Sequence, residues 1–328
     1  MRTRSKFLSF TTTLLLLASL MAGCGSNVPE SSVQATAGTE TKTAQETSEA
    51  GGMRTYKMVN GKEIQIPATP KRIVSDLYLG ELLAVGAKPV GIHPYELKNP
   101  FLTKEQLAEI EEIGDPISLE KITALNPDLI IISDEELYEQ VSKIASTVLI
   151  PYGTYNDDVH VDMRAFGELL GKQEAAEAWI KQFDEKSANA RDKVKEVVKE
   201  GETVGIYELR SQEFYVLGEN WGRGGQVIYN ALKLTPPTAV KEVVDANTPP
   251  KLVSLEVLPE FAADHMFVTT YETGKEDMDK FFQSSIYQNL PAVKNNHVYN
   301  MTFDQMYYYD PIAIEGQLDL MVEQLVTH

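Results

Sequence analysis

The sequence is poor in cysteine, in histidine and in basic residues. Cys24 is the only cysteine among 328 residues, so no intramolecular disulfide can form and no cysteine-based zinc site exists. Lysine and arginine number 30 against 48 aspartates and glutamates, and the formal net charge is −18. Such an acidic chain repels a phosphate backbone, which argues against nucleic acid as a partner. No metal-ligand spacing links the five histidines, which are His93, His160, His265, His297 and His328.

The sequence also lacks the common signatures of catalysis. It contains no Gly-x-Ser-x-Gly, no His-Glu-x-x-His and no Gly-x-x-x-x-Gly-Lys-Ser/Thr, the patterns of serine hydrolases, zinc proteases and phosphate-binding loops. We therefore predict no catalytic residue and a protein that is not an enzyme. A hydrolase without a recognised motif remains the alternative from that class.

Long apolar runs are absent except near the amino terminus. Residues 1–23 combine the basic residues Arg2, Arg4 and Lys6 with a short apolar run from Leu14 to Leu20, the pattern of a secretory signal peptide rather than of a membrane span. The end of this segment, Leu-Met-Ala-Gly-Cys24, resembles the lipobox of bacterial lipoproteins. That resemblance implies cleavage before Cys24, diacylation of its sulfur and an extracytoplasmic protein anchored to the cell membrane, since two acyl chains hold a protein stably.

The segment that follows is a predicted tether. Residues 24–52 are rich in Ser, Thr, Ala, Gly, Gln and Glu and have almost no large apolar side chain, so they cannot bury enough surface to fold. As a flexible coil, the segment would span roughly 30 Å. We expect it to hold a folded body away from the membrane.

A repeated unit organises the rest of the chain. Residues 117–132 recur in related form 136 positions later as residues 253–268, and each copy ends on a largely apolar run. The identical pairs are Ser118/Ser254, Leu119/Leu255, Glu120/Glu256 and Asp128/Asp264. Serine favours a helix N-cap, and a continuous apolar run is typical of a strand buried in a parallel sheet. Each copy is therefore predicted to form a short helix that leads into a buried strand, one copy in each of two similar lobes.

The fold class predicted is α/β, with two α/β lobes, parallel-type sheets and a ligand cleft between the lobes. Residues 53–158 form the first lobe, which starts with a hairpin at 56–67, and residues 200–328 form the second. Between them, residues 159–199 have a helical apolar pattern, which we interpret as a rigid connecting helix that allows little closure, although Gly171 is a possible interruption.

Aromatic residues and arginines gather at one point of the second lobe. Tyr207, Arg210, Tyr215, Trp221 and Arg223 fall within 17 residues, on predicted strand ends and on the turn that follows. They suit either core packing or the wall of a binding site. Glycines on both sides of Arg223 favour the second reading, because they leave the turn free of shielding side chains. Such a wall fits a bulky, partly apolar ligand that is rich in oxygen acceptors.

Taken together, the lipobox, tether, repeat and long helix resemble the solute-binding lipoproteins that serve ABC importers of ferric siderophores, heme and cobalamin. Residues 215–225, Tyr-Val-Leu-Gly-Glu-Asn-Trp-Gly-Arg-Gly-Gly, resemble the branch that binds ferric hydroxamates such as ferrichrome and ferrioxamine. The resemblance implies that Tyr215, Trp221 and Arg223 line the cleft and that Arg223 donates to iron-bound hydroxamate oxygens. We add Tyr207, Arg210 and Tyr307 as ligand-binding residues.

The ligand predicted is an iron(III)-siderophore complex. The siderophore fills the coordination sphere of ferric iron with its own oxygens, so no cofactor and no protein metal ligand are expected. In catecholate-binding relatives, basic cleft positions fall on Glu135 and Glu208 of this chain, and only Arg210 is kept, which disfavours a catecholate. Heme would need an axial Met, His or Tyr, which Tyr307, Tyr308 or Tyr309 could supply, so heme stays open, as does cobalamin.

Glu120 and Glu256 have two readings. Each lies two residues after a predicted N-cap serine, where a carboxylate interacts favourably with the helix dipole. By resemblance, they are the residues that pair with arginines on the two ABC permease subunits, one from each lobe. We predict docking to the permease by a monomeric protein. A wall-associated adhesion lipoprotein is the alternative from another class.

Overall fold

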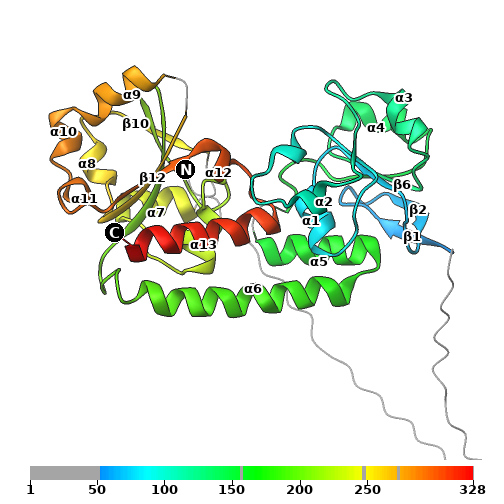
Figure 1. The fold of residues 1–328 in the computed structure, drawn as a ribbon, viewed down its shortest axis with the longest axis horizontal. Helices are drawn as coiled ribbons and strands as arrows, with labels where there is room; N and C mark the ends of the chain where they lie inside the picture. Colours follow the sequence, from blue (N-terminus) through cyan, green and yellow to red (C-terminus); the bar gives the residue numbers. More distant parts are fainter. Residues whose placement is uncertain (1–51, 156–157, 246–248, 272–273, 328) are drawn as a thin grey trace, which may run out of the picture. The chain divides into compact units, whose positions relative to one another are not determined.

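The structure is a computed structural model that describes residues 52–155, 158–245, 249–271 and 274–327. The predicted signal peptide, Cys24 and all of the tether except Gly52 lie outside these residues. Two five-stranded sheets organise the described part of the chain, each with its own set of helices (Figure 1). The predicted fold class, two α/β lobes with a long helix between them, is confirmed.

The sheet of the first lobe is parallel throughout. Its strand order is β5-β4-β3-β6-β7, and all four residues of β6 are buried, as expected for a strand covered on both faces. The predicted hairpin forms a separate antiparallel pair, β1 with β2. The elements of this lobe are β1 (Met53–Lys57), β2 (Glu63–Pro67), β3 (Ile73–Ser75), α1 (Leu79–Ala84), β4 (Gly91–Ile92), η1 (Glu96–Lys98), α2 (Lys104–Leu107), β5 (Glu111–Glu112), α3 (Leu119–Ala124), β6 (Leu129–Ile132), α4 (Glu135–Val141) and β7 (Ser146–Leu149).

The sheet of the second lobe is mixed. Its order is β10-β9-β8-β11-β12, with β8, β11 and β12 parallel and the β8-β9-β10 edge antiparallel. Its elements are β8 (Val204–Arg210), β9 (Glu213–Val216), η2 (Gln226–Ala231), α7 (Thr238–Asp245), β10 (Lys251–Val253), α8 (Leu258–Phe261), β11 (His265–Thr270), α9 (Lys275–Phe282), α10 (Ser285–Gln288), α11 (Pro291–Lys294), β12 (Val298–Thr302), α12 (Phe303–Tyr307) and α13 (Pro311–Thr327).

The repeated aspartate accepts equivalent backbone hydrogen bonds in both lobes. Asp128 precedes β6 and accepts hydrogen bonds from the backbone nitrogens of Lys71 and Arg72 at 2.7 and 2.9 Å. Asp264 precedes β11 and accepts from the backbone nitrogen of Thr203 at 2.8 Å. In each case a carboxylate joins the start of one central strand to the start of its parallel neighbour, which explains why the residue recurs in the repeat.

The helix of the repeat forms as predicted only in the first copy. Ser118 caps α3, because its hydroxyl accepts from the Lys121 nitrogen at 3.3 Å. In the second copy a turn follows Ser254, and the helix α8 starts only at Leu258. Pro259 explains the delay: proline has no N–H to donate, so it fits in the first turn of a helix and not further along. The predicted N-cap at Ser254 is therefore wrong.

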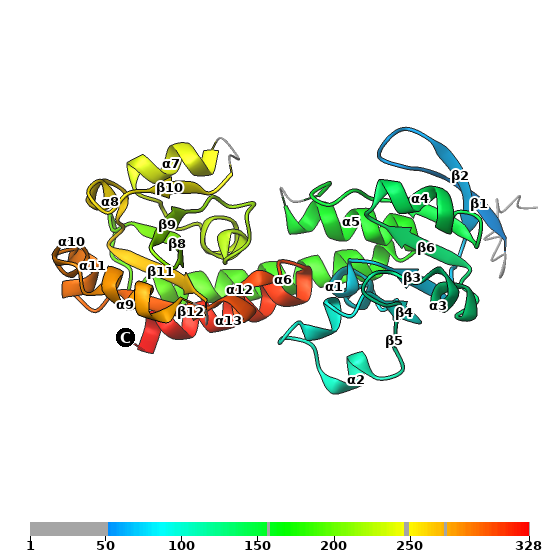
Figure 2. The ribbon, with the colours of Figure 1, turned by 90° about the horizontal axis from the view of Figure 1, so that it is seen from above.

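The connecting element of residues 159–199 is two helices rather than one. α5 (Val159–Leu170) ends at Gly171, whose φ of 66° is left-handed, and α6 (Gln173–Val194) begins two residues later. A glycine in this conformation commonly terminates a helix, and the Arg54 guanidinium donates to the last carbonyls of α5. The prediction of a single helix is thus corrected. The 22 residues of α6, about 33 Å long, make the crossing from one lobe to the other (Figure 2).

The carboxyl-terminal helix α13 packs at the junction of the two lobes and contacts both sides of it. It lies alongside α6 (Figure 1), where Lys186 pairs with Glu315 at 3.0 Å and with Asp319 at 2.7 Å. Asp310 caps its first turn and accepts from the Asn99 side chain of the first lobe at 2.8 Å. Residues 310–327, which were predicted to belong to the second lobe alone, therefore also contact the first lobe.

No helix of the described residues combines the length and the hydropathy that crossing a bilayer requires.

Candidate functional site

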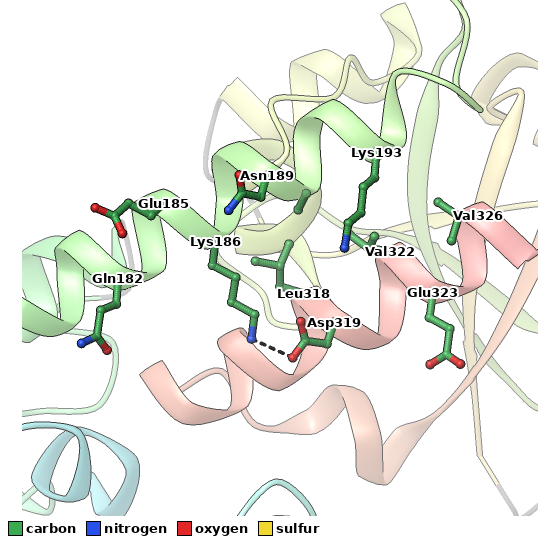
Figure 3. A pocket seen from close by; sticks show the side chains of 11 residues that line it. Gln182, Glu185, Lys186, Asn189, Lys193, Leu318, Asp319, Val322, Glu323 and Val326 are labelled. Atoms are coloured by element: carbon green, nitrogen blue, oxygen red, sulfur yellow. Dashed lines mark hydrogen bonds and ion pairs between the residues drawn. The ribbon is translucent and has the colours of Figure 1, made fainter.

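Two cavities of similar size stand out, and only one is lined by aromatic side chains. The first, about 630 Å³, is a groove between α6 and α13 (Figure 3). Charged side chains, amides and a few aliphatic side chains form its walls, and Lys186 crosses it to reach Asp319. The second, about 640 Å³, lies between the lobes and has the volume of a typical small-molecule site. The second cavity is the candidate site.

The interlobe pocket brings together most of the residues predicted to bind ligand. Five of the six, Arg210, Tyr215, Trp221, Arg223 and Tyr307, line it. The loop after β7 contributes Tyr152 and Gly153 from the first lobe. The other lining residues are Glu208, Leu217, Asn220, Gly222, Pro250 and Tyr309. The predicted position of the pocket between the lobes thus agrees with the structure.

Tyr207 is the exception. Its side chain is fully buried, and its hydroxyl donates to the Phe261 carbonyl at 2.7 Å inside the core of the second lobe. Successive side chains of a strand point to opposite faces of the sheet, so the face of β8 that carries Glu208 and Arg210 faces the pocket while Tyr207 faces away. The prediction of Tyr207 as a ligand-binding residue is wrong.

The turn that carries Arg223 has an unusual backbone. Gly222, Arg223 and Gly224 all have positive φ values, of 71°, 56° and 89°. A Cβ at position 224 would also lie 2.5 Å from the Met321 sulfur, so only glycine fits there. The Arg223 nitrogen donates to the Met306 carbonyl at 3.0 Å. A left-handed arginine costs of order 1 to 3 kcal/mol, and such strain gathers at functional sites.

A buried carboxylate joins the two arginines of the pocket wall. Glu208 is fully buried; one of its oxygens accepts from Arg210 and the other from Arg223. The Tyr271 hydroxyl donates to the first oxygen at 3.0 Å. Burial raises the pKa of Tyr271, and the Glu208 charge raises it further. Glu208 therefore holds both cationic side chains in place from behind.

Aromatic rings cover the faces of both guanidinium groups. The Arg223 guanidinium lies 4.7 Å from the Phe303 ring centroid and 5.8 Å from that of Tyr307, and the Arg210 guanidinium lies 5.0 Å from the Tyr215 centroid. Such stacking fixes the plane of the donors. Trp221 is 42% exposed, so its ring is open to a bound molecule.

Four residues of this site were not among the predicted ligand-binding residues. Glu208 had a signal, since it lies two positions before Arg210 on the same strand face. Tyr271 and Phe303 stack with centroids 4.5 Å apart beneath the arginines, yet they come from separate segments and no pattern links them. Tyr152 of the first lobe likewise joins the pocket through tertiary folding alone.

The tyrosines considered as heme ligands have different positions. Tyr307 and Tyr309 line the pocket. Tyr308 is buried and donates its hydroxyl proton to the Tyr95 carbonyl at 2.8 Å. Among the described residues, no three His, Cys, Asp or Glu side chains are placed to bind a metal ion together.

An acidic cluster lies beside the pocket. A small cavity of about 90 Å³ shares Tyr152, Tyr307 and Tyr309 with the pocket and is lined by Glu81, Glu96 and Asp310. Burial raises the pKa of Glu96 to about 8 and that of Asp310 to about 6. Burial raises the pKa of Glu81 well above its usual value, and the charges of Asp162 and Asp310 add to the effect. Near neutral pH the Glu96 carboxyl group is therefore mostly protonated, whereas that of Asp310 is mostly ionised.

The predicted docking residues lie away from the pocket lining. Glu120 is in the first turn of α3, and Glu256 is in the turn before α8. Both are exposed. Hydrogen bonds from its own backbone nitrogen and then from Ser254 lower the pKa of Glu256. Each lobe thus presents one charged carboxylate at the equivalent point of the repeated unit.

Comparison with known proteins identifies the class. The family model of the periplasmic binding proteins matches residues 73–305, and the chain belongs to this family. The iron(3+)-hydroxamate-binding protein YxeB of Bacillus subtilis is 43% identical over 299 residues, which cover 90% of this chain and 92% of YxeB. The predicted resemblance to ferric hydroxamate-binding solute-binding proteins is confirmed.

Solved structures agree with this placement. A FhuD-fold-family periplasmic binding protein component of a ferrichrome ABC transporter from Bacillus subtilis matches with a TM-score of 0.75 and 36% identity, over 83% of this chain and 100% of that one. FhuD2 of Staphylococcus aureus with bound ferrioxamine B matches with a TM-score of 0.67 and 25% identity, over 78% of this chain and 98% of that one.

Proposed function

We propose that this protein is the extracytoplasmic substrate-binding component of an ABC importer, that it binds ferric hydroxamate siderophores without catalysing a reaction, and that it delivers them to a membrane permease. The observation that carries the proposal is the position of Arg223. Its guanidinium packs against the rings of Phe303 and Tyr307, pairs with Glu208 and lies on the wall of a pocket of about 640 Å³.

The pocket has the chemistry that such a complex needs. A ferric trihydroxamate presents coordinated oxygens, which accept hydrogen bonds, on a largely apolar backbone. Arg223 and Arg210 supply charged donors, and Tyr215, Trp221 and Tyr307 supply apolar surface. The siderophore itself satisfies the hard ferric ion with oxygen ligands, so the protein's part is to recognise the outside of the complex. Proteins named as ferric hydroxamate-binding among the relatives support this assignment.

Fluorescence titration tests the ligand class. The chain has two tryptophans, Trp179 and Trp221, and Trp179 stacks on Phe183 away from the pocket lining. In a Trp179→Phe variant of the secreted form, the signal comes from Trp221 alone. Ferrichrome and ferrioxamine should quench it at low concentration, and heme, cobalamin and a ferric tris-catecholate should quench it much less. Tighter binding of heme or of the catecholate than of both hydroxamates would overturn the assignment.

Charge reversal at Glu120 and Glu256 should separate binding from delivery. Both carboxylates are exposed and lie away from the pocket lining, so the Glu120→Arg/Glu256→Arg variant should keep its ligand affinity within about twofold. Uptake of radioactive iron by cells that carry this variant should fall by about tenfold or more, because like charges across a docking surface repel the partner. Glu139→Arg, at another exposed position of the first lobe, is the control. Loss of affinity in the purified double variant would show that these residues take part in ligand binding and not only in docking.

The anchor is proposed to be Cys24. Cys24→Ala removes the thiol that the lipobox presents, so the protein should be found in the medium or remain uncleaved in the membrane. Ligand binding should not change, since the folded part begins about 28 residues later. Fractionation of cells followed by immunoblotting gives the answer. A variant that is cleaved normally and still sediments with the membrane would contradict lipidation at this residue.

A further inference from the structure

The wall of the interlobe pocket contains a negative charge that is not needed to contact a siderophore. The Glu208 side chain has no exposed surface, and it lies behind Arg210 and Arg223, whose side chains are 47% and 11% exposed. It accepts from both arginines and from Tyr271. A carboxylate in such a position is shielded from salt and water, so its field reaches the pocket with little screening.

The charges of the pocket add up to a small positive value. Among the described residues that line it, the charged side chains are Glu208, Arg210 and Arg223, which together carry one net positive charge. Without Glu208 the same wall would carry two. An exposed carboxylate nearby, Glu213, accepts from the Tyr215 hydroxyl at 2.9 Å, but it stands in solvent, where its field is weak.

We propose that Glu208 is the residue that sets the charge selectivity of the pocket: it lowers the wall from two net positive charges to one, so that the advantage of multiply anionic ferric complexes is reduced and neutral and cationic complexes are tolerated. The proposal rests on the proposed function and names the charge class of its ligands. The two arginines alone would attract any anion, including ferric complexes of carboxylates and catecholates. With Glu208 between them, they keep their donor geometry for coordinated oxygens while about half of their long-range attraction for anions is cancelled.

A single chelate with three different charges tests this inference. The ferrioxamine B complex has a terminal ammonium and a charge of +1, its N-acetyl derivative is neutral, and its N-succinyl derivative carries −1. The chelate is the same in all three, so the ratio of their affinities reports charge. At about 12 Å and an effective dielectric constant of about 20, Coulomb's law gives roughly a tenfold change in affinity for each unit of ligand charge.

Glu208→Gln should therefore change the ratio and not only the affinity. The cationic complex should bind about tenfold more weakly and the succinylated complex about tenfold more tightly, so their affinity ratio shifts by about 100-fold. Any loss caused by displaced arginines affects all three ligands alike and cancels in the ratio. The matched control is Glu213→Gln, which removes the same charge at an exposed site and should leave the ratio within about twofold of the wild type.

Two more variants allow the inference to be tested even if Glu208→Gln disturbs folding. Arg210→Gln lowers the charge of the wall and should move the ratio about 100-fold in the opposite direction, in favour of the cation. The Glu208→Gln/Arg210→Gln double variant restores one net positive charge without a buried unpaired group, and its ratio should return to that of the wild type. An unchanged ratio in Glu208→Gln and in Arg210→Gln would overturn the inference while leaving hydroxamate binding intact. Failure of the wild type to bind all three complexes would instead overturn the proposed function.

Discussion

Replacement of Arg223 by alanine is expected to weaken ferric hydroxamate binding by roughly 10- to 150-fold. A charged donor directed at coordinated oxygens in a partly dry pocket contributes about 1.5 to 3 kcal/mol, which corresponds to that range of affinity. The variant also loses the partner of one Glu208 oxygen, so a buried negative charge then faces the oxygens of the ligand. Both effects act in the same direction. Quenching of Trp221 fluorescence by ferrioxamine or ferrichrome measures the change.

Two further variants of arginine make this result interpretable. Arg223→Lys keeps the charge but loses the planar fork that reaches Glu208 and the ligand together, so its affinity should lie between those of the wild type and Arg223→Ala. Arg164→Ala removes an arginine that pairs with Glu177 on the exposed surface of α5 and α6 and should bind normally. If Arg223→Ala binds within about twofold of the wild type, the donor that recognises the iron-bound oxygens is another residue.

Most of the fold could be predicted because two strong local signals recur. The runs that close the two copies of the repeat, residues 129–132 and 265–268, lie in inner strands of the two sheets, and the aspartate before each run ties it to a neighbouring strand. Where single residues decided the outcome, prediction was weaker. Gly171 splits the connecting element into α5 and α6, and Pro259 delays the second helix of the repeat.

The candidate site could be predicted where one short segment supplies it. Residues 210–223 contribute Arg210, Tyr215, Trp221 and Arg223, and all four line the pocket. The error at Tyr207 is an error of strand face, because neighbouring residues of a strand point to opposite sides. The aromatic residues at positions 152, 271 and 303 come from three distant segments. Only the tertiary structure brings Tyr152 to the pocket and Tyr271 and Phe303 to the arginines.

Substitution of Glu81 is expected to have the second large effect, which is on the stability of the folded protein and not on ligand binding. Its carboxyl group is buried at the junction of the lobes, and its Oε2 atom has no hydrogen-bond partner. The carboxyl groups that face it come from other elements: Asp162 from α5, Asp310 from the start of α13 and Glu96 from η1. Burial raises the pKa of Asp162 to about 7, although a hydrogen bond with Glu81 opposes the rise. Burial and the neighbouring carboxyl groups therefore favour the protonated form of Glu81.

Replacement of Glu81 by glutamine should stabilise the protein at pH 8 and have little effect at pH 5. The folded-state pKa of Glu81 is raised above its unfolded value, so its contribution to stability is full below the unfolded pKa and is lost as the pH rises toward the folded one. Each pH unit in that window costs about 1.4 kcal/mol. Glutamine keeps the shape and a donor but cannot ionise, so Glu81→Gln should raise the free energy of unfolding at pH 8 by about 1 to 4 kcal/mol.

Urea unfolding followed by circular dichroism at the two pH values measures this difference. Glu139→Gln, on the exposed surface of α4, is the matched control and should change stability equally little at both. Gln cannot replace an ionised carboxylate, so if Glu81 is in fact charged and satisfied at the junction, Glu81→Gln will destabilise the protein, and more so at pH 8 than at pH 5. The sign of the pH dependence therefore shows whether the Glu81 carboxyl group, in the cluster between the lobes, is protonated in the folded protein.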